Sequence, residues 1–405
     1  MALLSENPLW EEFATRLLYT ASYGGADFGE VLTTMARIGD GDADAWHREW
    51  SATAERVAGW AAESAAGGHH VSARDAALRA AAYHRTAYQP LYGAPVDPRL
   101  TASFERESAA LKLAADAACE PRLELVEIPF EGASLPGLLA LAPGGGGPRP
   151  TIVHTNGYDS DLTEMVFAHV PAAIARGYHV LLFDGPGQGR NLIRDGIPIR
   201  PDWETVVRPV IDWVLERPEV DPDRVVLAGW SFGGYLAPRA AAFEPRLAAL
   251  VADPGQWDLR ETMLARLPLD DAQKAAFPDV DPHVLDPMEA YLRGPDADPS
   301  MRWRLIQRGL WVHGQETVFG YFADLTRFEL SPVAAEIRCP TLLTQAEDDP
   351  LGAGAPLLFD ALTVDRKALV RFGADEGAGG HCEGAARRLY HQRVFDWLDE
   401  TLAAA

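Results

Sequence analysis

Ser231 lies in a pattern that is typical of a catalytic nucleophile. The residues around it read GWSFG, with Gly229 and Gly233 two places before and after the serine, and they join the strand-like run VVLAGW to a helix-like run. A turn this sharp strains the backbone of the serine and leaves room only for glycine at the flanking positions. It also exposes the hydroxyl at the positive end of a helix, where a developing anion is favoured. The pattern therefore predicts that Ser231 attacks a carbonyl carbon.

A serine hydroxyl is a weak nucleophile and needs an adjacent base. Two histidines occur late in the chain, His381 and His391. His381 follows a predicted strand in the glycine-rich segment GADEGAGGHCEG, which suits a mobile base, whereas His391 falls within the last predicted helix and is interpreted as a surface residue. We therefore predict His381 as the base. Cys382, beside it, lacks the turn that a nucleophile needs and is interpreted as a small packing residue.

The base needs an acid that orients it and stabilises its cation. The predicted strand TLLTQAE is followed by Asp348 and Asp349, and Asp349 precedes a proline at which the chain turns. Asp349 is the preferred acid, since a chain order of serine, acid and histidine is expected for this kind of strand-to-helix nucleophile. Asp348 and Asp253, which ends the strand-like run AALVAD, remain open as alternatives.

Two backbone amides are needed to stabilise the oxyanion that forms when a serine attacks a carbonyl group. The amide of Phe232 is one candidate, because this residue follows the nucleophile. The loop after the run TIVHTN supplies the other, and we assign the amide of Tyr158, with Gly157 allowing close approach of the backbone.

The segment FDGPGQGRN contains three alternating glycines but lacks the spacing of a dinucleotide-binding loop, so we interpret it as a structural loop and expect no cofactor. No metal site is predicted either, because the cysteines show no CxxC pairing. The cysteines are Cys119, Cys339 and Cys382. The acidic run at 40–44 lacks the glycine and glutamate of a calcium loop, and Asp42 or Asp44 is interpreted as a helix cap.

The elements that must position these residues divide the chain. Residues 1–120 are predicted to form a helical N-terminal domain, in which Trp46, Trp50, Val57 and Trp60 share one face of a helix and pack against a neighbour. In residues 121–405, strand-like runs alternate with helix-like runs, which predicts an α/β fold with a mostly parallel sheet and helices on both faces. A helical insertion at about 259–330 is expected to lie over the site. Further helices are predicted at 72–88, 101–118, 162–176, 202–217 and 383–402.

Composition limits the partners. The formal net charge of −23 argues against nucleic acid and anionic membranes, which need a basic surface. The start of the chain lacks a secretory signal, and no run approaches the roughly 18 apolar residues of a membrane span. With its three cysteines and no disulfide pattern, the chain is expected to be soluble and cytoplasmic.

Several motifs together resemble a known family. They are SYGGADFGE, HTNGYDSDLTEM, FDGPGQGRN, GWSFGG, VADPGQWD and GAGGHCEGA. These resemble the α/β-hydrolases that carry a helical N-terminal domain, a group that includes bacterial 2,6-dihydroxypseudooxynicotine hydrolase and fungal pigment-pathway hydrolases that shorten aromatic polyketides. The resemblance implies the α/β-hydrolase fold, cleavage of an ester or of a carbon–carbon bond beside a ketone, and no cofactor. It also implies N-terminal helices that help to cover the site and form a homodimer.

Carried to this chain, the resemblance places a triad on Ser231, Asp349 and His381. It also matches Asp159 to an acidic residue near the site, which binds or polarises substrate, although capping of the helix near Leu162 is an equally good interpretation. We further predict Trp230 and Trp257 as substrate contacts. Aromatic residues crowd the insertion and favour a flat, aromatic or polyketide-like small-molecule substrate, but core packing explains them equally well.

Three functions fit the residues. The first is a serine hydrolase that works through an acyl-enzyme. The second is an acyltransferase or cyclase that uses the same triad, and the third is a binding protein without catalytic activity.

Overall fold

A single mixed sheet forms the centre of the protein in the computed structural model, which describes residues 3–144 and 147–403. Its strand order is β1-β2-β4-β3-β5-β6-β7-β8; β1 pairs antiparallel with β2 and β2 with β4, and every other pair is parallel. The strands are β1 (Arg122–Phe130), β2 (Ala133–Leu141), β3 (Arg149–Thr155), β4 (His179–Phe183), β5 (Val220–Trp230), β6 (Ala249–Asp253), β7 (Thr341–Ala346) and β8 (Lys367–Phe372). The predicted α/β-hydrolase fold with a mostly parallel sheet is confirmed.

The central strands are buried because their runs are almost wholly apolar. Every residue of β4 and of β6 is buried, as expected where helices cover both faces of a parallel sheet. The register pairs Thr155 of β3 with Gly229 of β5, and Trp230 of β5 with Asp253 of β6. The carboxyl ends of these strands therefore meet at one edge, where Ser231 follows β5 directly.

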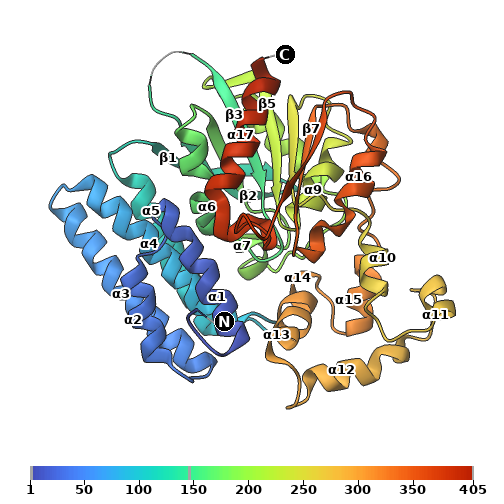
Figure 1. Cartoon of the computed structure of the whole chain (residues 1–405). Coiled ribbons are helices and arrows are strands. Elements are labelled where there is room, and N and C mark those ends of the chain that lie inside the picture. The colour runs from blue at the N-terminus through green and yellow to red at the C-terminus, as the bar shows by residue number, and fades with distance from the viewer. Residues whose placement is uncertain (1–2, 145–146, 404–405) are drawn as a thin grey trace.

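Helices occupy the first part of the chain and both faces of the sheet (Figure 1). The helices are α1 (Pro8–Tyr19), α2 (Phe28–Ile38), α3 (Ala43–Ala66), α4 (His70–Tyr88), α5 (Pro98–Asp116), α6 (Leu162–Ile174), α7 (Gly189–Ile193), α8 (Glu204–Leu215), α9 (Gly233–Ala241), α10 (Leu259–Leu264), α11 (Asp271–Ala276), α12 (Asp286–Arg293), α13 (Pro299–Arg302), α14 (Leu310–Val312), α15 (Val318–Leu325), α16 (Ala355–Ala361) and α17 (Arg387–Ala403). Short turns complete them, with 3₁₀ geometry except for the π turn η4: η1 (Thr20–Tyr23), η2 (Gln89–Leu91), η3 (Pro282–Leu285), η4 (Trp303–Gly309), η5 (Ala334–Glu336), η6 (Pro350–Gly354) and η7 (His381–Ala386).

The N-terminal helices follow the sequence pattern closely, with one exception. Asp42 caps α3, its side chain accepting a hydrogen bond of 3.0 Å from the amide of Ala45. Trp46, Trp50 and Val57 are fully buried. Trp60 is 44% exposed, so its predicted place in the packed face is wrong. The packed face of α3 continues through Val57 and Ala61, which are both fully buried, and Trp60 lies to one side of it.

The last helix begins later than predicted. Cys382 and Glu383 have positive φ angles of 51° and 48°, which no right-handed helix accommodates. The chain therefore makes the turn η7 after His381, and α17 starts at Arg387 instead of residue 383. Pro238 lies inside α9, the helix after the nucleophile, without ending it.

The predicted insertion is helical. No strand occurs between β6 and β7, all of whose intervening residues are described, and α10 to α15 with η3 and η4 fill most of this segment, the cap. Figure 1 shows the cap beyond one end of the sheet, meeting the N-terminal helices beside α1. Several contacts join them, among them a hydrogen bond of 2.7 Å from the indole nitrogen of Trp303 to the carbonyl of Gln89 and an ion pair of 2.6 Å between Arg304 and Glu12.

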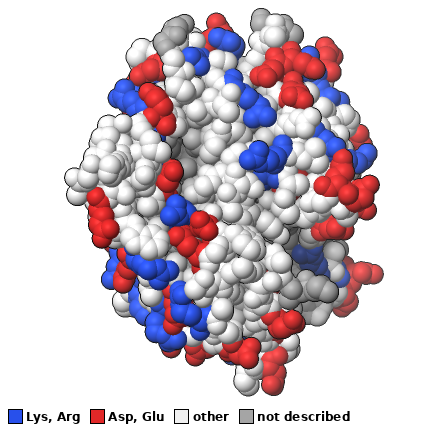
Figure 2. Space-filling model, turned by 60° about the vertical axis from the view of Figure 1, so that its left-hand side comes forward, with Lys and Arg blue, Asp and Glu red and all other residues white. Residues whose placement is uncertain are grey.

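Basic side chains lie among acidic ones on the face shown in Figure 2, and this face carries no continuous basic patch. Within the described ranges, no helix is both long and apolar enough to cross a membrane.

Candidate active site

Ser231 occupies a strained turn between β5 and α9. Its φ is +56°, in the left-handed region that side chains rarely adopt. Crowding explains the glycines around it: a Cβ at Gly233 would lie 2.6 Å from the carbonyl oxygen of Thr155, and one at Gly229 would overlap the carbonyl of Gly233. The steric reason predicted for this turn is therefore present in the structure.

A chain of hydrogen bonds connects Ser231 to a buried carboxylate. The Oγ atom of Ser231 lies 2.8 Å from Nε2 of His381, and Nδ1 of His381 lies 2.7 Å from Oδ2 of Asp349. The Asp349 side chain is 1% exposed, whereas that of His381 is 45% exposed. Burial alone would raise the pKa of Asp349, but hydrogen bonds from His381 and from the amides of Leu351 and Cys382 bring this pKa below its ordinary value. The arrangement keeps the acid ionised and leaves the serine and histidine open to a substrate.

The two alternative acids lie elsewhere. Asp348 is exposed. Asp253 is fully buried, but its carboxylate accepts hydrogen bonds from Thr344 at 3.0 Å and from Arg387 at 2.9 Å. Of the three candidates, Asp349 is the carboxylate that contacts His381.

Asp349, His381 and Cys382 present donor atoms within 4.8 Å of one another, a spacing that also suits metal ligands. Both ring nitrogens of His381 already have partners in Ser231 and Asp349. Burial raises the pKa of the Cys382 thiol well above its ordinary value, with the charge of Asp253 adding to the effect. A protonated thiol is a poor metal ligand, so the geometry favours proton transfer between serine and histidine.

The loop after β3 lies directly against the nucleophile. A Cβ at Gly157 would fall 2.7 Å from Cβ of Ser231, so only glycine allows this approach. The rings of Tyr158 and Phe232 lie next to each other, with centroids 5.2 Å apart. Across residues 3–144 and 147–403, the backbone amides of Tyr158 and Phe232 have no hydrogen-bond acceptor. Two free amides beside the serine are what an oxyanion site requires.

Asp159 is held by arginines. Its carboxylate pairs with Arg16 at 3.1 Å and with Arg308 at 3.0 Å, and its side chain is 11% exposed. Burial would raise the pKa of this carboxyl group, but the two arginines lower it well below its ordinary value. The cap of α6 is Asp161, which accepts from the amide of Glu164 at 3.1 Å. The predicted capping role of Asp159 is therefore wrong, and its carboxylate is occupied by protein groups.

The two predicted aromatic contacts, Trp230 and Trp257, are close in the chain to Ser231 or in space to the turn after Asp349. The Trp230 ring packs edge-on against His169, with centroids 4.8 Å apart, and lies 4.4 Å from the guanidinium of Arg387. Trp257 is half-buried against Gly354, in the turn that follows Asp349. Most other aromatic residues of the cap are buried in packing, among them Trp303, Trp311 and Tyr321.

Sequence reasoning missed a polar cluster behind the triad. His391, expected at the surface, is 2% exposed; it contacts the carbonyl of Ala168 at 2.9 Å and the hydroxyl of Tyr23 at 2.8 Å. Glu383 is also buried, and burial raises its pKa to about 11, with Asp253 adding to the effect and Arg387 opposing it. The spacing of Glu383 and Arg387, four residues apart near a helix start, is the one signal that pointed to this cluster.

Known proteins resemble this chain in sequence and in fold. Residues 139–389 match the alpha/beta hydrolase family. The hydrolase acrC of Aspergillus aculeatus is 34% identical, with 95% of this chain and 94% of acrC aligned. A 20-hydroxy-prefusarin hydrolase of Gibberella moniliformis is also 34% identical, over 96% and 95% of the two chains. The crystal structure of a 2,6-dihydroxy-pseudo-oxynicotine hydrolase superimposes with a TM-score of 0.74 at 22% identity, covering 96% of each chain. The chain therefore belongs to the alpha/beta hydrolase family and is a hydrolase.

Proposed function

We propose that the protein is a serine hydrolase that cleaves an ester, or a carbon–carbon bond beside a ketone, through an acyl-enzyme. The observation that carries this proposal is the unbroken series of hydrogen bonds from Ser231 through His381 to Asp349, which begins at a serine held at φ +56°. A hydroxyl in this position becomes a usable nucleophile because the base is already within hydrogen-bonding distance of its proton.

In the first half of the reaction, His381 takes the proton of Ser231 as Oγ attacks the substrate carbonyl carbon. Asp349 holds the ring of His381 and stabilises the cation that forms. The amides of Tyr158 and Phe232 donate to the oxyanion. The tetrahedral intermediate then collapses to the acyl-enzyme, and the leaving alkoxide or stabilised carbanion takes the proton that His381 holds. In the second half, water attacks the acyl-enzyme with His381 as base and releases the acid.

The substrate class rests on the curated relatives. At 34% identity over nearly the whole chain, one relative is named for hydrolysis of 20-hydroxy-prefusarin. We infer a small organic substrate of polyketide-like or aromatic character for this chain as well. The half-buried Trp257 packs against Gly354 in the turn that follows Asp349 and is the better placed of the two predicted tryptophans, since the ring of Trp230 already packs on His169 and Arg387.

A fluorophosphonate probe tests the nucleophile, because it labels only an activated serine. We expect labelling of the wild-type protein and of Ser72→Ala, whose serine is exposed on α4, and none of Ser231→Ala. A panel of aryl esters and aromatic β-diketones, followed by mass spectrometry of the products, then identifies the bond. Labelling that survives in Ser231→Ala, or turnover that is unchanged in that variant, would overturn the proposal. Addition of an acceptor alcohol separates hydrolysis from acyl transfer, since a transferase yields the new ester.

A further inference from the structure

The loop that carries the Tyr158 amide is fixed from two directions. On the side of the sheet, the side-chain amide of Gln188 donates to the carbonyls of Asn156 and Gly157, both at 2.9 Å, and the amide of Gly157 donates to Ser160 at 3.0 Å. These bonds hold the residues before Tyr158. The residue after it, Asp159, is held by groups from outside the sheet.

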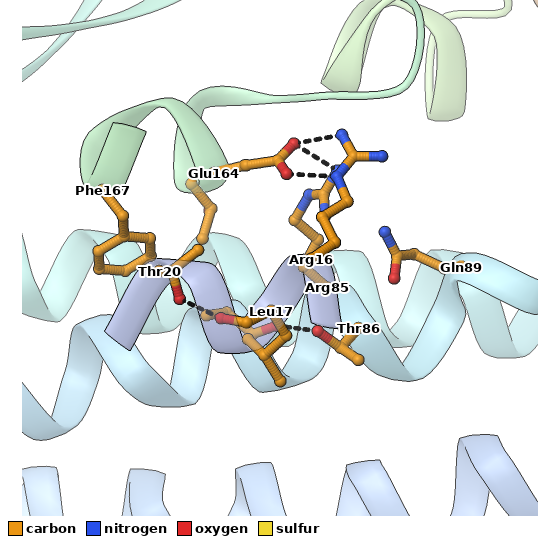
Figure 3. Close-up of a pocket in the computed structure, with 10 residues that line it drawn as sticks. Arg16, Leu17, Thr20, Arg85, Thr86, Gln89, Glu164 and Phe167 are labelled. Carbon is orange, nitrogen blue, oxygen red and sulfur yellow. Dashed lines mark hydrogen bonds and ion pairs between the residues drawn. The ribbon is translucent and has the colours of Figure 1, made fainter. Parts of the chain in front are cut away.

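The N-terminal helices supply one set of these groups. Arg85 of α4 donates to the carbonyl oxygen of Asp159 at 2.6 Å, and Arg16 of α1 pairs with its carboxylate at 3.1 Å. Figure 3 shows Arg16 and Arg85 converging on the carboxylate of Glu164 from the two helices. Both the main chain and the side chain of Asp159 are therefore anchored to elements that precede the sheet in the sequence.

The cap supplies the other group, Arg308 of η4. Its Nη1 atom lies 3.0 Å from Oδ2 of Asp159, and its guanidinium lies 4.9 Å from the ring centre of Tyr158. The same guanidinium lies 5.1 Å from the ring centre of Trp303, and the indole nitrogen of Trp303 is hydrogen-bonded to the carbonyl of Gln89. Arg308 thus touches the oxyanion residue and its neighbour at once, and aromatic packing fixes its orientation.

Stability alone does not account for this arrangement. Within the described residues, Nε of Arg308 is buried without a hydrogen-bond partner, and desolvating a charge in this way costs about as much as an ion pair returns. An arginine that is 21% exposed, but whose Nε atom is buried in this way, is better explained by the position that it imposes on its partners. The partner that matters here is the segment Tyr158–Asp159, which lies beside Ser231.

We propose that Arg308 is a positioning residue for the oxyanion site: through Asp159 and the Tyr158 ring it holds the Tyr158 amide in place, so the site is complete only when the cap is seated on the N-terminal helices. This inference rests on the proposed function. It assigns to the cap a role in the chemical step besides any contact with substrate, because transition-state stabilisation depends on amides held in place before the reaction.

The test uses the full chain with p-nitrophenyl butyrate as substrate and phenylboronic acid as a tetrahedral adduct of the serine. Arg308→Gln should lower kcat about tenfold to a hundredfold, the effect of a misplacement on the order of 1 Å, with KM within about threefold because ground-state binding does not use the oxyanion site. The affinity for phenylboronic acid should fall with kcat, and Arg308→Lys should recover part of both losses.

Arg293→Gln is the matched control, since Arg293 also lies in the cap but pairs with Glu289 of its own helix, α12, and not with the N-terminal helices. It should leave kcat and the phenylboronic acid affinity unchanged. Unchanged kcat and boronate affinity in Arg308→Gln, or a loss confined to KM, overturns the inference; should Arg308→Gln fail to fold, the same two readouts on Arg308→Lys decide. Ser231→Ala separates the two proposals, because activity that survives in that variant refutes the proposed function itself.

Discussion

Gly157 lies so close to Ser231 that a side chain at 157 would displace the nucleophile: its Cβ would fall 2.7 Å from Cβ and 3.2 Å from Oγ of the serine. Gly157→Ala should therefore move Oγ away from His381 or push the Tyr158 amide out of the oxyanion site. Either displacement should lower kcat for p-nitrophenyl butyrate by about a hundredfold. Fluorophosphonate labelling should slow in parallel.

Gly59→Ala provides the comparison for this prediction. Gly59 is exposed within α3, and a Cβ there meets no atom within 4 Å. The change should leave kcat unaltered and raise stability by up to about 1 kcal/mol through helix propensity. Equal rates for Gly157→Ala and wild type would show that the loop relaxes without disturbing the serine.

Asp349→Asn should separate the three candidate acids. The amide keeps the size of the side chain but no longer stabilises the histidine cation, and it favours the wrong ring tautomer. A loss in kcat of about 10⁴ is expected. Asp348→Asn, at an exposed position, should retain nearly full activity. Steady-state kinetics on both variants checks this, and a larger loss for Asp348→Asn than for Asp349→Asn would reassign the acid.

The site was predictable where its signals are local. The glycines around Ser231, the strand before it and the loop before His381 each follow from short-range sterics, which the sequence displays directly. The alternation of apolar runs likewise predicted the parallel sheet, because burial of both faces of a strand requires apolar residues throughout.

Other features depend on contacts between distant segments and left no such signal. His391 was interpreted as a surface residue because it is polar and lies within the last helix, but Tyr23, far away in the sequence, and the carbonyl of Ala168 bury it. Asp159 resembled a helix cap because it precedes α6, yet the partners that determine its role are Arg16 and Arg308. Pairings across more than a hundred residues do not follow from the local pattern around either member.

Glu383 should make stability depend on pH in an unusual direction. Burial raises its pKa to about 11 in the folded protein, so the native state keeps a proton that the unfolded chain releases. Stability is then fully present below the ordinary carboxyl pKa and declines as pH rises toward the folded value, by at most about 1.4 kcal/mol for each pH unit. Glu383→Gln removes this dependence.

Urea unfolding at about pH 5, 7 and 9 measures the effect. The free energy of unfolding of Glu383→Gln, relative to wild type, should increase steadily across this series. Glu63→Gln, at an exposed position of α3, should show no comparable trend. A constant difference between Glu383→Gln and wild type at all three values would mean that Glu383 is ionised in the folded protein.

Asp161 should contribute far more to stability than its capping role explains. It caps α6 and also accepts from Arg85 at 2.9 Å and from Tyr88 at 3.0 Å, and the side chains of Asp161 and Arg85 are each 5% exposed. Asp161→Ala removes the cap and leaves the Arg85 charge buried with one fewer partner, so a loss of about 3–5 kcal/mol is expected. Asp42→Ala removes a cap from α3 at an exposed position, and a loss of about 1 kcal/mol is expected there. The difference between the losses for Asp161→Ala and Asp42→Ala in the free energy of unfolding isolates the buried contact of Asp161 with Arg85. If the two losses are equal, the contact between the N-terminal helices and α6 contributes little to the stability of the fold.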